Sequence, residues 1–580
     1  MEENQELEKN THAESSFTFS GELTKKKMVS YFPAMLVTYL STLLLITVDG
    51  LVVSNMCGAS ALSSVNIFQP ATIFIGIISM LVSAGAATRL SSVMGKIDIT
   101  QLLQTRATLK IIMIVAAIFV TIIQIPIVYI IIDSYHLSPE MNSLVWNYAI
   151  GIMIASPFGF ISTIGVLQLQ IIGKMRVLMG LAALEGGVNL VLDLLFVGPM
   201  NMGVAGAGYG TLAANVVRCT TTLIYLIKKT DVFYCGQEKA SMREVWAIIQ
   251  RGIPDAAHSL MNAIQNYAIM YIILSSFGEI GGAIKGVCSF TVSIATVFIN
   301  SIVGSVRPMC GLFSGAENHK GLGVLMWQGI FVSIILTGGF LAVVELFPSL
   351  FYSLHGVTDI PNGGIMSLRL YASYFVFLGI NSLFRLYFSN RKIIKFTTTV
   401  TIIGSGSLLL FAVIFSNTLP PVYLWLSYLA SETIIIIANV IRYIMVIKND
   451  KNSRAENEID LYLTITPKEA IEASRHIRSY ASEHNINRKH AFRAALCVEE
   501  MTAYAKNTHK SDTVDIQVMI RFFPDKAILM IIDDGKCIYL DNEKANQKIV
   551  TSNYGLLKKL SDTVEYQYVL DLNYTVCKYA

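Results

Sequence analysis

Charged residues are scarce in this chain. Of its 580 residues, 14% are Asp, Glu, Lys or Arg and 53% are hydrophobic, whereas a soluble protein carries roughly 25% charged residues. The mean hydropathy is correspondingly high, at +0.55. This composition excludes a single large cytosolic enzyme, a disordered chain and a nucleic-acid-binding protein.

Patterns of cysteine and histidine that bind metals or form disulfide frameworks are also missing. The eight cysteines are scattered, no C-x-x-C occurs, and no histidine lies at a ligand spacing from them. We therefore expect neither a disulfide scaffold nor a metal site. The N-terminal segment MEENQELEKNTHAESS is polar and lacks the short apolar run of a cleavable signal peptide.

The few charges are unevenly distributed along the chain. Residues 449–580 hold 18 Lys and Arg and 19 Asp and Glu, so the apolar part before them carries the net positive charge. Such an excess is typical of cytosolic loops in a membrane protein. We expect a polar cytosolic tail (1–28), two transmembrane lobes (29–230 and 251–448) joined by a cytosolic linker (231–250), a second linker (449–460) and a cytosolic domain (461–580).

Apolar runs of about 20 residues, the length that crosses a bilayer, occur twelve times. They lie at about 31–54, 67–88, 107–132, 144–170, 178–198, 203–228, 252–277, 283–306, 322–347, 366–389, 393–416 and 421–447. Every second connection between them is basic, and the alternate ones, such as NMCGAS, VGPMN and SNTLP, carry almost no charge. The positive-inside rule then places both termini in the cytosol of a multi-pass protein of the plasma membrane.

An internal repeat divides the twelve spans into two sets of six. When Pro33 is aligned with Pro254, Gly58 falls near Gly278. Gly95 in SSVMGKID then aligns with Gly315 in GLFSGAEN, 37 residues after the earlier glycine in both halves. Both halves begin on the same side, so the sequence predicts a membrane all-α fold of two six-helix lobes related by an axis along the membrane normal, with a cavity between them.

Ionisable residues within the spans are candidates for function, because a charge inside a bilayer costs about 2.5 to 3.5 kcal/mol on insertion scales. Asp49 and Asp193 each lie about five residues before the outer end of a span, roughly 7 Å inside the boundary. They lie on two helices of one lobe and could meet. The other intramembrane acids are Glu185, Glu345 and Glu432.

The fifth span presents a polar face. Glu185, Asn189 and Asp193 follow at i, i+4 and i+8 and therefore lie on one side of a helix. Two carboxylates in one low-dielectric site cannot both ionise cheaply, and this property suits proton coupling. The alternatives are that Asp193 caps the span, that Glu185 bonds a neighbouring helix, and that Glu345 and Glu432 serve packing or an interface.

Three segments resemble the multidrug and toxic compound extrusion (MATE) family. They are VDGLVVSNMCGASALSSVNIFQP, MRVLMGLAALEGGVNLVLDLLFVGPMNMGVAGAGYGTLAANV and the GIP opening of the second half, and the resemblance covers about 28–448. It implies an antiporter of drugs or metabolites driven by protons or sodium, with its coupling site in the N-terminal lobe. By position, that site comprises Asp49, Asn189, Asp193 and Thr211.

The second lobe departs from branches of that family which carry an acidic residue about ten positions after the GIP proline. The stretch DAAHSLMNAIQNYAIM places only Asn262, Gln265 and Asn266 there, so a second sodium site is not expected. These polar residues either bind substrate or pack between helices. His258 is expected to be an interfacial side chain, and the span arginines Arg218, Arg307, Arg369 and Arg385 are expected near span ends, reaching the membrane interface.

The last 120 residues alternate in hydropathy and predict an α+β domain. IDLYLTI, TVDIQVMIRF, KAILMIIDDG, TVEYQYVL and NYTVCKY are expected as strands, and PKEAIEASRHIRSYASEH, RKHAFRAALCVEEMTAYAKNTH and GLLKKLSD as helices. The order resembles the GHKL-type ATPase domain of anti-sigma-factor serine kinases, with its histidine-kinase-like ATPase fold. By position, Glu500 matches the catalytic glutamate, Asp533 and Gly535 the adenine-reading D-x-G loop, and Gly555 the start of the helix after the phosphate loop.

Two departures from that family affect catalysis. Tyr504 stands where the Mg²⁺-binding asparagine is expected, and TSNY before Leu556 lacks the glycines of a phosphate loop. A phenol is a poor ligand for a hard cation, and a backbone without glycine approaches phosphate less closely. We expect weak or absent ATP hydrolysis, so a regulatory or protein-binding domain is favoured over a nucleotide sensor, and the chain needs no cofactor.

The sequence thus predicts a cation-coupled antiporter that exports cationic or amphiphilic small molecules, with H⁺ preferred over Na⁺ as coupling ion. The alternatives are a lipid-linked precursor flippase of the same superfamily and a membrane-tethered signalling protein that uses the ATPase-like tail. A cytosolic protein is a further expected partner of the tail, and nucleic acid is not. The substrate, the choice of coupling ion, the tail's ligand or partner and the oligomeric state are left open by the sequence.

Overall fold

The protein divides into two compact units. The structure, a computed structural model, describes residues 21–580 except 231–233, 356, 358, 453–458, 510–513 and 536–552, and a few helical side chains, that of Asp49 among them, also lie outside the description. One unit is Met28–Arg442, and the other is Tyr443–Ala580 together with the chain up to Lys27. The expected tail at 1–28 therefore lies largely outside the described residues.

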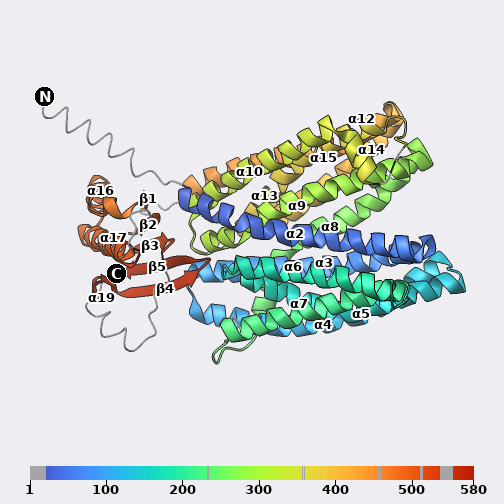
Figure 1. Ribbon diagram of the computed structural model, residues 1–580. Helices are drawn as coiled ribbons and strands as arrows, with labels where there is room; N and C mark the ends of the chain where they lie inside the picture. The colour runs from blue at the N-terminus through green and yellow to red at the C-terminus, as the bar shows by residue number, and fades with distance from the viewer. Residues whose placement is uncertain are drawn as a thin grey trace. The chain divides into compact units, whose positions relative to one another are not determined.

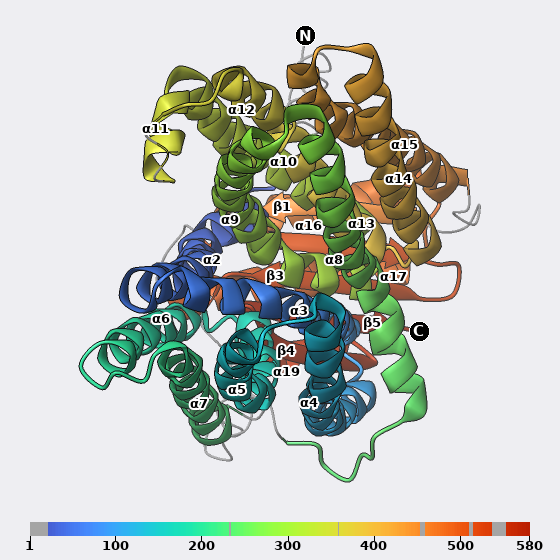
Figure 2. The same cartoon turned by 90° about the vertical axis from the view of Figure 1, so that its right-hand side faces the viewer.

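The first unit consists of long helices (Figure 1). In chain order they are α2 (Glu22–Cys57), α3 (Ala59–Lys96), α4 (Ile99–Tyr135), α5 (Pro139–Ile171), α6 (Met175–Val197), α7 (Val204–Lys229), α8 (Met242–Phe277), α9 (Glu279–Gly315), α10 (His319–Leu346), α11 (Pro348–Leu354), α12 (Gly364–Ala372), α13 (Phe375–Asn390), α14 (Ile394–Thr418), the 3₁₀ turn η1 (Pro421–Trp425) and α15 (Leu426–Asn452). Figure 2 shows α3 to α7 grouped on one side of the unit and α9 to α15 on the other.

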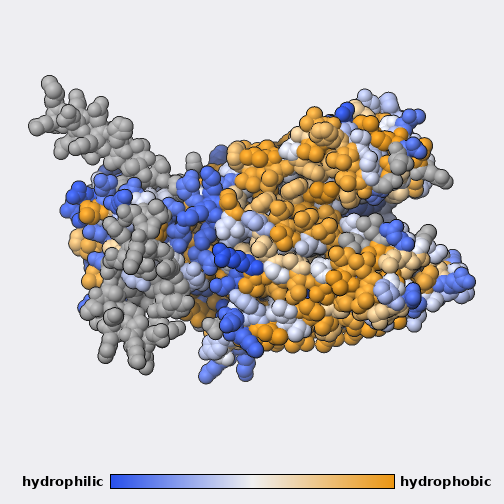
Figure 3. All heavy atoms as spheres, viewed as in Figure 1, coloured by the Kyte–Doolittle hydropathy of each residue, from blue (hydrophilic) through white to orange (hydrophobic). Residues whose placement is uncertain are grey.

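Apolar side chains cover the outside of these helices. On α4, Ile111, Ile114, Ile118 and Ile122 are all more than half exposed, and Figure 3 shows a broad hydrophobic surface over this unit. Such a surface needs lipid around it, because exposing so large an apolar area to water is unfavourable in free energy. The chain is therefore a multi-pass membrane protein.

Ten helices of the described chain are long and apolar enough to cross a membrane, whereas the sequence predicts twelve spans. The expected spans at 252–277 and 366–389 fall on α8 and on α12 with α13, which are not among the ten. Polar residues such as Asp255 and Asn262 lower the hydropathy of α8, and a break at Ser373 and Tyr374 divides the other span. The count of twelve therefore stays a prediction.

Side-chain caps mark where several helices begin. The carboxylate of Asp98 accepts a hydrogen bond from the Gln101 backbone N–H at 2.9 Å at the start of α4. The side chain of Asn318 does the same for Gly321 at 2.7 Å at the start of α10. Such caps satisfy N–H groups that have no partner inside the helix, and so fix where it starts.

Helices α3 and α9 cross in close backbone contact at two glycines. A β-carbon at Gly95 would lie 2.0 Å from the carbonyl oxygen of Leu312, and one at Gly315 would lie 2.0 Å from that of Ser92. Only glycine allows this approach. Gly95 and Gly315 are the two positions that the sequence repeat pairs, and their reciprocal contact is the geometry that a twofold relation between the lobes requires.

The second unit contains a five-stranded antiparallel sheet with the strand order β1-β2-β3-β5-β4. The strands are β1 (Ile459–Ile465), β2 (Ile516–Phe522), β3 (Ala527–Asp533), β4 (Thr563–Val569) and β5 (Leu572–Tyr579). The helices are η2 (Pro467–Glu469), α16 (Ala470–Glu483), α17 (Arg488–His509) and α19 (Asn553–Leu560). These elements confirm the secondary structure predicted for the described part of residues 459–580.

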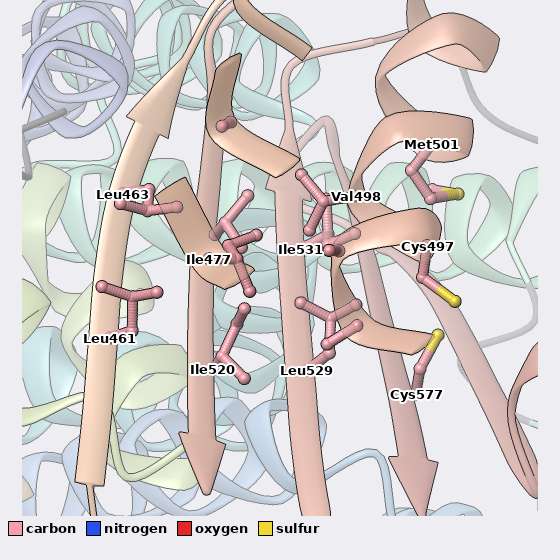
Figure 4. Packing of buried hydrophobic residues seen from close by; sticks show 14 of the residues in the cluster. Leu461, Leu463, Ile477, Cys497, Val498, Met501, Ile520, Leu529, Ile531 and Cys577 are labelled. Atoms are coloured by element: carbon pink, nitrogen blue, oxygen red, sulfur yellow. The ribbon is translucent and has the colours of Figure 1, made fainter. Parts of the chain in front are cut away.

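Alternating strand residues and one side of the helices form the core of this unit. Leu461, Leu463, Ile520 and Leu529 from the sheet pack with Ile477 of α16 and with Val498 and Met501 of α17. Figure 4 shows these side chains between sheet and helices, with the sulfurs of Cys497 and Cys577 facing each other. The unit therefore has a hydrophobic core of its own, as expected of an α+β domain.

Candidate functional site

A polar cluster lies between α6 and α7 in the N-terminal lobe. Asn189 and Asp193 on α6 are 1% and 0% exposed. The amide Nδ2 of Asn189 donates to the hydroxyl of Thr211 on α7 at 3.4 Å. A β-carbon at Gly210 would lie 1.9 Å from Oδ1 of Asp193, so the carboxylate rests against the backbone of α7. Three of the four predicted coupling residues thus lie together.

Glu185, on the same face of α6, forms an ion pair. Its carboxylate lies 2.7 Å from Nη1 of Arg218 on α7, and both side chains are largely buried. The expectation that Arg218 reaches the membrane interface is therefore wrong, because a buried guanidinium is more stable beside a carboxylate than in an apolar layer. This ion pair accounts for the charge of Glu185 on the face of α6 that also carries Asn189 and Asp193.

Asp49 lies on α2, but its side chain is outside the described residues, so its predicted meeting with Asp193 stays a prediction. Side chains of α2 do reach glycines of α6 and of its C-terminal end on both sides of these positions. A β-carbon at Gly186 would lie 3.8 Å from Cβ of Ser41, and one at Gly198 would lie 2.8 Å from Cε of Met56.

The C-terminal lobe contains a polar cavity of about 370 Å³, with a smaller chamber of about 50 Å³ beside it. The predicted candidates Asn262, Gln265 and Glu432 line both. Asn266 lines the larger chamber. His258, expected at an interface, also lines the cavity, where its Nε2 lies 3.2 Å from Nδ2 of Asn262.

Sequence reasoning missed an ion cluster of which two members, Asp255 and Arg385, line this cavity. Arg307 of α9 and Arg385 of α13 lie 3.2 and 3.5 Å from the two carboxylate oxygens of Asp255 on α8. Both arginines are mostly buried, so the expectation that they reach the membrane interface is wrong. The available signal was Asp255 itself, which directly follows the GIP proline. Arg369 is different: it is 42% exposed and lies 3.4 Å from Glu345.

Glu432 is held by a chain of amides. Nδ2 of Asn381 donates to Oε2 of Glu432 at 2.6 Å, and Nδ2 of Asn439 donates to Oδ1 of Asn381 at 3.0 Å. Asn381 and Asn439 are buried. This network fixes the position of the carboxylate at the cavity wall.

In the tail, two residues of the predicted nucleotide site, Asp533 and Gly535, lie in contact with each other. Asp533, at the end of β3, is 3% exposed, and its Oδ1 accepts hydrogen bonds from the Gly535 N–H at 2.8 Å and from Nδ2 of Asn573 at 2.7 Å. Glu500 and Tyr504 lie on α17 and are partly buried. Helix α19 begins at Asn553, two residues before Gly555, and the residues before it lie outside the description.

A bound metal ion needs several ligating side chains arranged around it. Among the described residues, no group of three or more His, Cys, Asp or Glu side chains is arranged to hold an ion. Burial and the charges of Lys489 and Arg493 lower the pKa of the tail's His490 below its usual value. Burial likewise raises the pKa of the tail's Asp515.

The comparisons with known proteins agree with this fold. Residues 33–195 match the MatE family model. A probable multidrug resistance protein of Bacillus subtilis, YpnP, is 28% identical over 171 residues, which are 30% of this chain and 37% of that protein. The matched segment thus spans well under two thirds of the relative's length.

Solved structures extend the similarity to 74% of this chain. An outward-facing multidrug-resistance MATE transporter of the MOP superfamily matches with a TM-score of 0.70 and 20% identity, over 74% of this chain and 97% of that one. A MOP superfamily transporter from Pyrococcus furiosus, described as having a binding pocket of reverse polarity, gives 0.68 and 20% over the same shares. The membrane unit therefore has the fold of MATE transporters. The family model matches a part of that unit, residues 33–195.

Proposed function

We propose that this protein is an antiporter that exports cationic or amphiphilic small molecules in exchange for a cation, H⁺ in preference to Na⁺. The observation that carries the proposal is the fully buried Asp193, whose carboxylate lies against Gly210. Asn189 precedes it by four residues on α6, and Thr211 follows Gly210 on α7. A carboxylate buried in a membrane unit is costly to keep charged, and binding a cation removes that cost. An exchangeable cation at Asp193 then favours one packing of α6 and α7 over another.

Asp49 is the proposed second acid of the coupling site. Helices α2 and α6 approach at Ser41 and Gly186 and again at Met56 and Gly198. Asp49 lies eight residues after Ser41, and Asp193 lies seven residues after Gly186. Two helices that run side by side from the first contact to the second would bring the two acids to the same level.

The experiment is export from proteoliposomes under an imposed pH gradient and, separately, under a sodium gradient. Asp193→Asn should abolish transport driven by the coupling ion while leaving a monodisperse, inserted protein. Glu345→Gln is the control, because that carboxylate is 42% exposed and pairs with Arg369. Normal gradient-driven export by Asp193→Asn would refute the coupling site.

A lipid-linked precursor flippase is the second candidate, and the arginines beside the cavity of the C-terminal lobe favour it. Arg307 and Arg385 would suit an anionic head group, but both also contact Asp255, which offsets part of their charge. Transbilayer movement of a polyprenyl pyrophosphate that is insensitive to Asp193→Asn would support the flippase.

For the tail we propose a regulatory domain that derives from the GHKL ATPases and has lost catalysis. The clustered Asp533, Gly535 and Asn573 support a GHKL-like loop, whereas Tyr504 replaces a magnesium ligand. We also propose that both termini lie in the cytosol, because basic residues recur in every second connection.

A further inference from the structure

We propose that the cavity in the C-terminal lobe binds an amphiphilic zwitterion, whose carboxylate contacts Arg385 and whose ammonium group contacts Glu432. The inference rests on the proposed function in one respect only, that this ligand is the exported substrate. Arg385 comes from α13 and Glu432 from α15, and both line the larger and the smaller chamber.

The guanidinium of Arg385 contacts one carboxylate, that of Asp255, while Glu432 acts on it only through space. Asp255 is shared between Arg307, at 3.2 Å, and Arg385, at the longer distance of 3.5 Å, so one carboxylate faces two cations. Nη2 of Arg385 also donates to Oγ of Ser382 at 3.3 Å. These contacts use two of five N–H groups. A ligand carboxylate can take the others in the paired geometry that guanidinium groups favour.

The carboxylate of Glu432 is held by an uncharged group. The Asn381 amide fixes its position at 2.6 Å without cancelling its charge. An ionised Glu432 therefore attracts a cation from the cavity. A ligand with one charge would satisfy Arg385 or Glu432, whereas a zwitterion satisfies both and brings no net charge into a low-dielectric site.

The remaining wall suits an aromatic body and disfavours a plain cation. Tyr371, Tyr374 and Tyr428 form a cluster with ring centroids 4.8 to 5.3 Å apart. Nζ of the buried Lys285 donates to the Tyr428 hydroxyl at 3.2 Å and lies over the rings of Tyr371 and Tyr428. This ammonium already takes the cation–π position, so a second cation there would be repelled. A ligand ammonium is thereby directed to Glu432.

The test compares three dansyl probes on the purified full-length protein in detergent, by fluorescence titration. Nε-dansyl-lysine is the zwitterion, dansylcadaverine has the same skeleton without the carboxylate, and Nα-acetyl-Nε-dansyl-lysine keeps the carboxylate but lacks the ammonium charge. We expect the zwitterion to bind at least about tenfold more tightly than either relative, the usual size of one charge-assisted contact.

Variants assign each charge to its residue. Arg385→Gln should abolish the preference over dansylcadaverine, and Glu432→Gln should abolish the preference over the acetylated probe. Arg369→Gln, outside the cavity, should keep both preferences. If Arg385→Gln does not fold, Arg385→Lys replaces it and should keep only part of the first preference, because lysine loses the paired geometry.

Three outcomes would overturn the inference. The three probes could bind with equal affinity, or none could bind at all. The third is an equal loss of affinity for all three probes in Arg385→Gln or in its replacement Arg385→Lys. These outcomes are separate from those of the proposed function, because binding is measured without a gradient. Failed export with intact zwitterion binding refutes the antiporter alone, and gradient-driven export without a charge preference in binding refutes this site alone.

Discussion

Asp193 of α6 and Gly210 of α7 are in contact, with the carboxylate of the first set directly against the Cα of the second. A β-carbon at position 210 would lie 1.9 Å from Oδ1 and 3.1 Å from Cγ of Asp193. Glycine at 210 is therefore what allows a carboxylate to be buried between these helices beside Asn189 and Thr211. A side chain at position 210 would occupy the place of the Asp193 carboxylate.

Gly210→Ala should displace Asp193 and reduce gradient-driven export at least about tenfold. Overpacking of this kind costs about 1 to 3 kcal/mol, so we expect the protein still to fold. Gly187→Ala on α6 is the matched control, because a β-carbon there meets nothing within 4 Å. Initial export rates in proteoliposomes provide the measurement, and similar rates for the two alanine variants would show that the contact has no role.

The sequence predicted features that depend on local spacing and missed those that depend on distant pairing. Asn189 and Asp193 are four residues apart on one helix, so their shared face could be read directly. The tail strands were predicted for the same reason, since alternation is a local signal. By contrast, Asp255, Arg307 and Arg385 come from three helices far apart in the chain, and only the packing of α8, α9 and α13 shows that they form one cluster.

The span expected at 252–277 falls on α8, which is not among the ten helices long and apolar enough to cross a membrane. Asp255, Asn262 and Gln265 on this helix are polar and line the cavity. The role of Gly210 could not be read from the sequence, because it depends on where Asp193 points. A glycine shows such a role only through its neighbours on another helix.

Glu244→Gln should destabilise the membrane unit strongly. Glu244 at the start of α8 accepts hydrogen bonds from Nε and Nη2 of Arg89 on α3, at 2.8 and 2.5 Å, and from Thr105 at 3.0 Å. Both charged side chains are less than 10% exposed. Removing one partner of a buried pair typically costs about 3 to 5 kcal/mol, because the other charge is left buried without compensation.

Thermal unfolding of the detergent-solubilised protein measures this effect, with Glu565→Gln as control. The Glu565–Lys578 pair in the tail is substantially exposed, and such pairs contribute about 0 to 1 kcal/mol. An unfolding temperature for Glu244→Gln as high as that of the control would contradict the assigned role of the Arg89 pair.

Mg²⁺ with ATP should leave the tail unaffected. Oδ1 of Asp533 already accepts from Gly535 and Asn573, and Tyr504 on α17 offers no amide oxygen for the metal. Hydrogen exchange of β3 and α17 in the full-length protein, with and without Mg²⁺ and ATP, is the measurement. In Tyr504→Asn, protection of the backbone amides by Mg²⁺ and ATP would show that the metal ligand is the only part that nucleotide binding lacks. The same protection in the unmodified protein would favour a nucleotide sensor.

Acidification from pH 7.5 to 5.5 should destabilise the tail around α17 through His490. The imidazole is 4% exposed, and its burial, together with Lys489 and Arg493, lowers its pKa, while Asp562 and Asp525 oppose the shift. In the unfolded chain an imidazole takes up a proton below about pH 6.5. Since the folded state binds that proton only at lower pH, stability falls as the pH drops through this window.

Hydrogen exchange of α17, corrected for the intrinsic pH dependence of the exchange rate, should show the loss in the unmodified protein. His490→Gln cannot take up the proton, so its protection should vary less with pH. An unchanged dependence in that variant would assign the effect to other groups.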